Sequence, residues 1–277
     1  MEIEQIMTKK LSKKLPAVSI VTVNYNGKKF LKDCFDSLSK LNYPKERLEI
    51  VMVDNGSKDG SIAFVEQKFS QVKIVKNDVN NYCRANNLGI RKSKGKYVAV
   101  LNNDTRVDKN WLLELVKTIT SDNLIAAVGG KILFPNGKIQ SMGHQELPNF
   151  YWADNDDKEN DFKTYEKKKD VESLSGCAVL YRKNALSEVN YFDEDFNMFL
   201  EDVDIAIRLR KQGWKVVLVH QCKVYHVKHG TIEEGRAQFY SERNRLLLIA
   251  KHYPEKLSTA LLGSGFFTAL KDLDSFA

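Results

Sequence analysis

The sequence predicts an α/β fold, with a doubly wound, mainly parallel sheet in the first half and a more irregular second half. Residues 17–122 alternate between β-branched runs and segments with helical spacing, which is typical of a parallel sheet with right-handed crossovers. The rest of the chain carries hairpin signals and a long polar stretch. We expect one domain over residues 17–252, with halves at 17–122 and 123–252, between a basic tail at 1–16 and a C-terminal segment at 253–277.

Strands and helices are predicted in strict alternation in the first half. The runs "AVSIVTVN" and "LEIVMVD" are continuously apolar, as in strands that are buried on both faces of a sheet. After the first run, Leu31, Phe35 and Leu38 recur at helical spacing. The strands are predicted at residues 17–24, 48–54, 72–75 and 96–102, and the helices at 30–41, 62–69, 84–92 and 109–120.

The second half gives fewer regular signals. The stretch "VGGKILFPNGKIQS" predicts a strand and a hairpin around Pro135-Asn136-Gly137, because Asn-Gly favours tight turns. Residues 148–172 are polar, aromatic and charged, and we expect a long excursion there. The remaining strands are predicted at 177–182 and 215–220, and the remaining helices at 201–212 and 236–252.

The composition is typical of a soluble globular protein, with 277 residues, 43% hydrophobic and 29% charged. A net charge of +7 favours binding to nucleic acid, phosphorylated ligands or anionic lipid headgroups. Charge alone does not distinguish among these partners. The cysteines are widely spaced and the N-terminus has no apolar stretch, so we expect reduced thiols and a cytoplasmic location. The best apolar run near the C-terminus has about 14 residues, fewer than the roughly 20 that span a membrane.

A ligand site is predicted where the carboxyl ends of the parallel strands meet. With a strand order of 3-2-1-4, the loops after strands one, two and four converge where the order reverses. These loops carry Tyr25-Asn26-Gly27, Asp54 and Asn102-Asn103-Asp104. Asx residues also form turns, so either carboxylate alone fits a turn as well as a site. Two carboxylates at one crevice favour the site.

The chemistry expected at this crevice is binding of a diphosphate. No GxGxxG or GxxxxGK[ST] motif follows the first strand, so a diphosphate would need another neutraliser. A divalent cation held by Asp104 would serve, because hard cations choose oxygen ligands and bridge carboxylates to phosphates. Asp54 could accept hydrogen bonds from a base or a ribose.

A cluster of acidic residues lies in "FDEDFNMFLEDVD", at residues 192–204. Charge at a helix N-terminus explains part of it, because the helix dipole favours carboxylates there. The apolar residues directly before Glu201 would also desolvate a carboxylate and raise its pKa toward the range of a general base. The carboxylates are Asp193, Glu194, Asp195, Glu201, Asp202 and Asp204.

Histidines gather near the end of the predicted sheet. His220, Cys222, His226 and His229 lie within ten residues, in a spacing that matches no zinc finger. His220 ends a predicted strand, and we expect a structural role for it. Either His226 or His229 could add a nitrogen ligand to a metal at Asp104.

Several stretches, taken in order, resemble glycosyltransferase family 2 with the GT-A fold, and most of all its rhamnosyltransferase-like branch. The resemblance covers roughly residues 17 to 252. It is carried by "VSIVTVNYNG", "VDNGSKDGS", "VAVLNNDT", "SGCAVLYRK", "FDEDFNMFLEDVDIAIRLRKQGW", "VYHVKHGT" and "YSERNRLLLIAKH".

This resemblance implies a Rossmann-like nucleotide-binding half joined to an acceptor-binding half. It implies that Asp54 contacts the nucleotide base, with Tyr25 and Asn26 in the same pocket. Residues 102–104 occupy the DxD position, where Asp104 would bind Mn²⁺ or Mg²⁺. The remaining nucleotide, diphosphate or sugar contacts are expected at Arg84, Asn86, Asn87 and Asn103.

The same resemblance implies the catalytic groups. Asp202, in the pair with Glu201, would be the catalytic base. His226 would join the metal or the diphosphate, with His229 as the alternative, and Arg243 and Asn244 match a pair near the active site. Two features depart from the family pattern: Asn102 replaces the first carboxylate of DxD, and "NDVNNYCRANNLG" lacks the usual glycines.

The function implied is an inverting transfer of a sugar from a nucleotide donor to a hydroxyl group. dTDP-rhamnose or a UDP-sugar is the expected donor, and a glycan or lipid-linked molecule of cell-surface polysaccharide synthesis the expected acceptor. A place at the inner membrane face fits the resemblance, and nucleic acid is not an expected partner. The alternatives are a sugar-1-phosphate nucleotidyltransferase and a non-catalytic protein that binds nucleotide or glycan.

Overall fold

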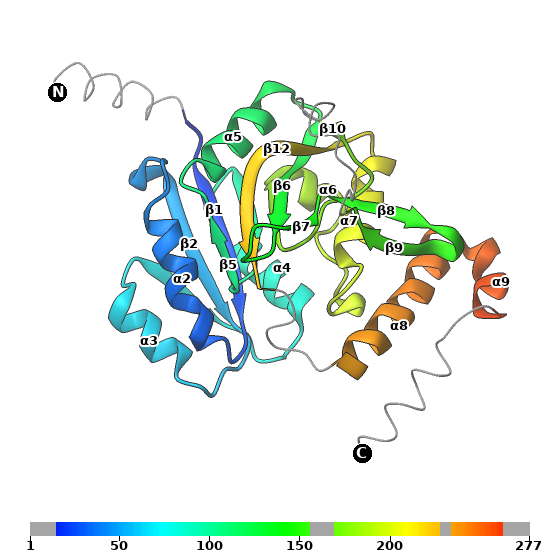
Figure 1. Ribbon diagram of the computed structural model, residues 1–277, viewed down its shortest axis with the longest axis horizontal. Coiled ribbons are helices and arrows are strands. Elements are labelled where there is room, and N and C mark those ends of the chain that lie inside the picture. The colour runs from blue at the N-terminus through cyan, green and yellow to red at the C-terminus, as the bar shows by residue number, and fades with distance from the viewer. Residues whose placement is uncertain (1–14, 156–168, 228–233, 263–277) are drawn as a thin grey trace.

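The computed structural model describes residues 15–155, 169–227 and 234–262. The first half forms a parallel sheet in the predicted order β3-β2-β1-β4 (Figure 1). Every residue of the first strand is buried, as expected for a strand covered on both faces. The strands are β1 (Val18–Asn24), β2 (Leu48–Asp54), β3 (Val72–Lys76) and β4 (Tyr97–Leu101).

Strands from the second half continue the same sheet. β11 (Ala178–Arg182) lies antiparallel between β4 and β6 (Ile125–Leu133), and β12 (Lys215–His226) pairs with β6 in parallel. The full order is β10-β12-β6-β11-β4-β1-β2-β3. Shorter strands complete it: β5 (Thr105–Val107) pairs with β12, β7 (Ile139–Ser141) with β6, and β10 (Lys169–Asp170) with β12.

Helices cover both faces of the sheet (Figure 1). One apolar cluster joins the strands to α2 (Lys28–Ser39), α3 (Ser61–Lys68) and α5 (Trp111–Ser121). The other joins them to α4 (Tyr82–Lys92), α6 (Lys183–Glu188) and α7 (Glu201–Lys211). The last helices are α8 (Glu234–His252) and α9 (Leu257–Leu262), and short 3-10 turns lie at η1 (Lys45–Arg47), η2 (Pro148–Phe150), η3 (Glu194–Phe196) and η4 (Pro254–Lys256).

Two predicted elements differ from the structure. The strand predicted at 215–220 continues to His226, because β12 first pairs with β6 and then, beyond an irregularity after Val219, also with β5. His220 therefore lies inside the strand rather than at its end, and His226 is the last residue of the strand rather than part of a loop. The excursion predicted at 148–172 includes β9 (Tyr151–Asp154), which forms a hairpin with β8 (His144–Leu147) beside α8 (Figure 1).

Candidate functional site

A cavity of about 610 Å³ opens at the carboxyl ends of β1 and β4. Its walls come from both halves of the chain: the loops after β1 and β4, strands β7 to β9, the segment before α7, and α8. Ligands of open parallel sheets bind at this edge. Of the predicted site residues, those that line it are Tyr25, Asn103, Asp104, Glu201, Asp202 and His226.

Asp104 and His226 meet on one wall of this cavity. Asp104 lies between β4 and β5, and His226 is the last residue of β12. The pairing of His226 with Thr105 brings the two side chains together. His226 Nε2 lies 3.2 Å from Asp104 Oδ1, and each side chain is 10% exposed. His229 lies outside the described residues.

The chemistry of this pair fits a divalent cation. Two neighbouring ligands of an octahedral ion, each about 2.1 Å from it, lie about 3 Å apart, close to the separation of these two atoms. Within the described ranges, no group of three His, Cys, Asp or Glu side chains forms a complete metal site. A cation at Asp104 and His226 would therefore need further ligands from a bound diphosphate or from water.

The two asparagines before Asp104 are held by neighbouring side chains. Asn102, which replaces the first carboxylate of DxD, accepts a hydrogen bond of 2.8 Å from Tyr82 Oη. Asn103 donates one of 2.8 Å to Asn24 Oδ1. Gly27 permits this contact, because a Cβ there would lie 2.2 Å from Asn103 Nδ2.

The residues predicted around the nucleotide differ in their access to the cavity. Tyr25 lines the cavity and is 41% exposed. Asn26 has a φ of 48°, and its side chain accepts a hydrogen bond from Lys58 N. Asp54 is 3% exposed and accepts hydrogen bonds from Gly56 N and Ser57 N, so it shapes the loop after β2. Its contact with a base stays a prediction.

The α4 residues expected at the diphosphate or sugar do not line the cavity. Asn87 is buried and donates hydrogen bonds to Phe192 O and Glu194 Oε1, which joins α4 to the segment around η3. Asn86 is also buried and donates to Tyr82 O within the helix, while the Arg84 side chain is exposed. Their contacts with a donor stay predictions.

Glu201 and Asp202 begin α7 and face the same cavity from the other half of the chain. Asp202 accepts a hydrogen bond of 2.7 Å from Gly176 N at Oδ2 and one of 2.8 Å from Val203 N at Oδ1. Glu201 is buried, and its Oε2 has no hydrogen-bond partner in the structure. Burial, with a smaller effect of the Asp202 charge, raises the pKa of Glu201 well above its usual value. The predicted desolvation therefore acts most clearly on Glu201.

Asp204 has a structural place in the acidic cluster. It is fully buried and forms ion pairs with Arg208 and Lys251 and a contact of 2.8 Å with His252 Nε2. Burial alone would raise the pKa of Asp204, but the hydrogen bond from His252 and the Arg208 charge lower it to about 2. Asp204 thus joins α7 to α8.

The backbone before Glu201 has an unusual conformation. Asn197, Phe199 and Leu200 have φ values of 59°, 68° and 62°, in the left-handed region that bulky side chains rarely adopt. Asn244 of α8 donates hydrogen bonds to the carbonyls of residues 196, 198 and 199. Arg243 donates to Asp195 O and to Asn244 Oδ1. The predicted Arg-Asn pair therefore supports the segment that carries the carboxylates.

Sequence reasoning missed several polar residues that line the cavity, among them Gln140, His144 and Asp154. His144 Nε2 lies 3.5 Å from Asp154 Oδ1 and 3.9 Å from Asp202 Oδ2. Gln140 contacts His226. Gln140 follows the Asn-Gly turn, and the strands β8 and β9 lie in polar sequence, so neither apolar spacing nor a motif marks these residues.

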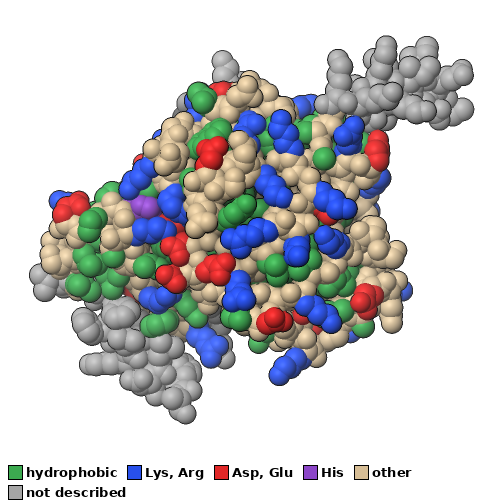
Figure 2. Space-filling view, turned by 180° about the vertical axis from the view of Figure 1, so that it is seen from behind, with side chains coloured by type: hydrophobic (Ala, Val, Ile, Leu, Met, Phe, Trp, Pro, Cys, Tyr) green, Lys and Arg blue, Asp and Glu red, His purple; other side chains and the backbone are tan. Residues whose placement is uncertain are grey.

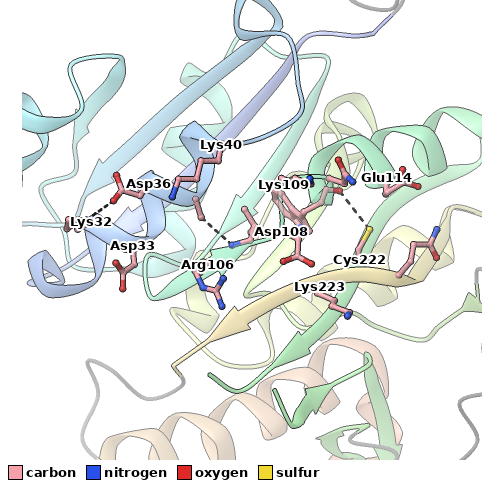
Figure 3. Close-up of a pocket in the computed structure, with 15 residues that line it drawn as sticks. Lys32, Asp33, Asp36, Lys40, Arg106, Asp108, Lys109, Glu114, Cys222 and Lys223 are labelled. Carbon is pink, nitrogen blue, oxygen red and sulfur yellow. Dashed lines mark hydrogen bonds and ion pairs between the residues drawn. The ribbon is translucent and has the colours of Figure 1, made fainter. Parts of the chain in front are cut away.

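A second cavity, of about 860 Å³, lies among α2, β5, β12 and the start of α5 (Figure 3). None of the predicted site residues lines it. Its basic and acidic side chains partly pair with one another, as Lys32 does with Asp36. Cys222 Sγ is directed toward Trp111 O at 3.8 Å. The predicted site residues that line a cavity all line the first one, which is therefore the candidate active site.

Residues 19–189, more than half of the chain, match the family described as Glycosyl transferase family 2. This chain belongs to glycosyltransferase family 2. The assignment confirms the family that the motifs resemble and decides against a sugar-1-phosphate nucleotidyltransferase.

Several named proteins are similar in sequence to this chain. It is 30% identical to the O-antigen biosynthesis protein RfbC of Myxococcus xanthus over 76% of this chain and 17% of that protein. It is 30% identical to glycosyltransferase AglE of Haloferax volcanii, over 54% of this chain and 51% of AglE. A poly-beta-1,6-N-acetyl-D-glucosamine synthase of Staphylococcus epidermidis is 24% identical to this chain, over 76% of this chain and 50% of the synthase. The chain thus spans about half or less of these relatives.

Solved structures of glycosyltransferases show the GT-A fold predicted for this family 2 member. GalNAc-T7 with UDP, GalNAc and Mn²⁺ has a TM-score of 0.69 at 18% identity, over 88% of this chain and 50% of that chain. The mannosyltransferase PcManGT of Pyrobaculum calidifontis, in complex with GDP-Man and Mn²⁺, has a TM-score of 0.64 at 16% identity. The match covers 99% of this chain and 81% of PcManGT. In the part of this chain that the structure describes, no helix has the length and apolar character needed to cross a membrane.

Proposed function

We propose that this family 2 member transfers a sugar from a nucleotide-diphosphate donor to a hydroxyl group of an acceptor by a single inverting displacement. One observation carries the proposal: the Glu201–Asp202 pair and the Asp104–His226 pair line the same cavity. A proton acceptor and a site for the leaving group are thus available to one bound donor.

Asp104 and His226 are the proposed ligands of a divalent cation, Mn²⁺ or Mg²⁺. When bound, such a cation neutralises the negative charge of the diphosphate. Tyr25 and Asn103 line the wall that adjoins this pair, and we assign the nucleotide and diphosphate to that side. Held there, the donor would present its sugar toward the α7 side of the cavity, where the acceptor would enter.

Asp202 is the proposed base. It takes the proton of the acceptor hydroxyl, whose oxygen forms a bond to the anomeric carbon while the bond from that carbon to the diphosphate oxygen breaks. Burial raises the pKa of Glu201 well above its usual value and favours its neutral form, which places less negative charge beside Asp202 than a second carboxylate would. Two adjacent carboxyl groups with different surroundings are a common arrangement for acid–base chemistry.

The donor is proposed to be a UDP-sugar or dTDP-rhamnose. GalNAc-T7 was solved with UDP and PcManGT with GDP-Man, which supports a nucleotide donor without choosing the base. The names of the RfbC and poly-N-acetylglucosamine synthase relatives support a glycan or lipid-linked acceptor in cell-surface polysaccharide synthesis. His144 and Asp154, on the hairpin side, are proposed acceptor contacts.

The test begins with a thermal-shift panel of nucleoside diphosphates, with and without Mn²⁺. A nucleoside diphosphate that raises the melting temperature only when Mn²⁺ is present identifies the base of the donor. Hydrolysis of the corresponding nucleotide sugars is then measured with Mn²⁺ and with EDTA. Metal-dependent hydrolysis supports the enzyme, whereas binding of every stabilising donor without hydrolysis or transfer would indicate a non-catalytic binding protein.

A further inference from the structure

Gln140 contacts His226 through both ends of its side-chain amide. Gln140 Nε2 lies 3.0 Å from His226 Nδ1, and Oε1 lies 3.3 Å from the same nitrogen. Across the ring, His226 Nε2 lies 3.2 Å from Asp104 Oδ1. Gln140 and His226 are 5% and 8% exposed, so water has little access to compete for these contacts. Gln140, His226 and Asp104 thus contact one another in that order, and the last two are the proposed ligands of the cation.

Paired strands hold these three side chains in position. Gln140 lies on β7, which pairs with β6, and β6 pairs with β12, whose last residue is His226. His226 in turn pairs with Thr105, the residue after Asp104. The positions of the three side chains are thus fixed by the sheet, and the freedom that remains is the orientation of the amide and of the ring proton.

A neutral imidazole carries its proton on one nitrogen, so the partner of Nδ1 decides what Nε2 can do. A cation at Nε2 requires the lone pair of that atom and therefore the proton on Nδ1. In the absence of a cation, the same lone pair would face the Asp104 carboxylate and repel it. With a cation at Nε2, Nδ1 carries the proton and needs a hydrogen-bond acceptor as its partner. Without a cation, Nε2 carries the proton and Nδ1 needs a hydrogen-bond donor.

We propose that Gln140 is a positioning residue that sets the tautomer of His226; this inference rests on the metal role proposed for Asp104 and His226. Without a cation, the amide N–H of Gln140 is donated to Nδ1, and Nε2–H is donated to Asp104. With a cation, the amide turns over, Oε1 accepts Nδ1–H, and Nε2 is free to bind. In this exchange one proton leaves Nε2 and one is taken up at Nδ1.

Only an amide meets both requirements at this position. Its oxygen and nitrogen exchange places by rotation about one bond, and both already lie within hydrogen-bond distance of Nδ1. A glutamate at residue 140 could only accept, which fixes the cation-binding tautomer. A methionine of similar length offers no strong partner and leaves the ring orientation unsupported.

The first test is the tautomer itself, read from ¹⁵N shifts of histidine-labelled full-length protein, with His226 assigned by a H226Q variant. The metal-free wild type is expected to carry the proton on Nε2, and saturating Mg²⁺ to move it to Nδ1. The metal-free Q140E variant is expected to carry a proton on Nδ1 already. A metal-free wild type with the proton on Nδ1 would overturn the inference.

The second test is Mn²⁺ affinity, measured by the electron paramagnetic resonance signal of free Mn²⁺. Q140M should bind Mn²⁺ about 10-fold more weakly than wild type, the scale seen when the partner of a ligating histidine is lost, whereas Q140E should retain binding. Q145M, on exposed Gln145 of β8, is the matched control and should be unchanged. Equal affinities of Q140M and wild type would overturn the role of Gln140. Unchanged Mn²⁺ binding in D104N would instead overturn the metal site itself.

Discussion

Glu201 and Asp202 are neighbours in sequence with different surroundings. Asp202 accepts two backbone hydrogen bonds, whereas Glu201 is buried with one oxygen unpartnered in the structure. Because burial raises the pKa of Glu201 above 4.5, the folded protein keeps a proton that the unfolded chain loses. The free energy of unfolding should therefore fall as pH rises above about 4.5, until Glu201 ionises in the folded state as well.

Glu201→Gln removes this effect, because the amide cannot ionise. The variant should equal wild type in stability at about pH 4 and be more stable at about pH 8, as measured by urea denaturation. Glu66→Gln, at an exposed position of α3, is the control and should leave the pH dependence as it is. The same pH dependence in Glu201→Gln and wild type would contradict the raised pKa.

Asp202→Asn tests the proposed base. The amide has nearly the same shape but cannot take a proton, so the transfer rate should fall roughly 100-fold or more. Donor affinity, measured by calorimetry, should be retained because the nucleotide is assigned to the side of Tyr25 and Asn103. Near-normal transfer by the variant would move the role to another group.

Asp104→Ala tests the proposed metal ligand. It should abolish the metal-dependent part of nucleoside diphosphate binding, measured by calorimetry with Mn²⁺ and with EDTA, while the melting temperature changes little. Asp108→Ala is a suitable control, since Asp108 follows β5 and lines the other cavity (Figure 3). If the variant and wild type bind equally well in both conditions, Asp104 is not a ligand.

At the scale of elements, α8 holds the segment that leads into α7. Asn244 donates to three carbonyls of residues 196–199, a stretch with several positive φ values. Asn244→Asp replaces the donor with an acceptor, so this stretch should shift and displace Asp202 from the donor. The transfer rate is expected to fall roughly 10-fold or more, since small displacements of a catalytic group are costly.

For Asn244→Asp, both the turnover number and the donor affinity are measured and compared with wild type. The turnover number should fall, while the affinity for the donor stays close to wild type. Asn184→Asp, at an exposed site on α6, controls for the added charge. Loss of donor affinity without loss of turnover would show that the segment serves the nucleotide instead.

Sequence patterns predicted the elements of the first half and their order because buried parallel strands are continuously apolar, as in β1 and β2. Asp104 and Asp202 could be singled out because a strand end and an acidic cluster mark them. Gln140 and His144 could not, because Gln140 meets His226 through the pairing of β6 with distant β12, and His144 pairs with distant Ser173. The length of β12 was missed for the same reason: its last residues pair with β5, and no local pattern records that partner.

At the scale of the whole molecule, positive charge favours contact with anionic surfaces. The net charge is +7, and basic side chains are spread over most of the face in Figure 2, where acidic ones are fewer. Each basic residue close to an anionic membrane contributes about 1 kcal/mol, an attraction that salt screens. Further basic residues, at "KKLSKK" and at Lys167 and Lys168, lie outside the described residues, as do residues 263–277.

Peripheral membrane binding is therefore predicted, and liposome flotation measures it. The protein should float with anionic liposomes at low salt, less at high salt, and little with neutral liposomes. Deletion of residues 255–277 should weaken the binding. No difference between anionic and neutral liposomes at low salt would reject the prediction and favour an acceptor in solution.

The place of β11 in the sheet has a consequence for synthesis of the chain. β4 and β6 follow one another closely in sequence, but β11, at residues 178–182, lies between them in space. A growing chain that has emerged only as far as β9 lacks the strand that links its two halves. The parallel strands can associate early, but the two walls of the cavity can be joined only after the ribosome has released β11. Folding of the active site thus waits for synthesis of residues 178–182, and until then the edges of β4 and β6 that pair with β11 lack their partner.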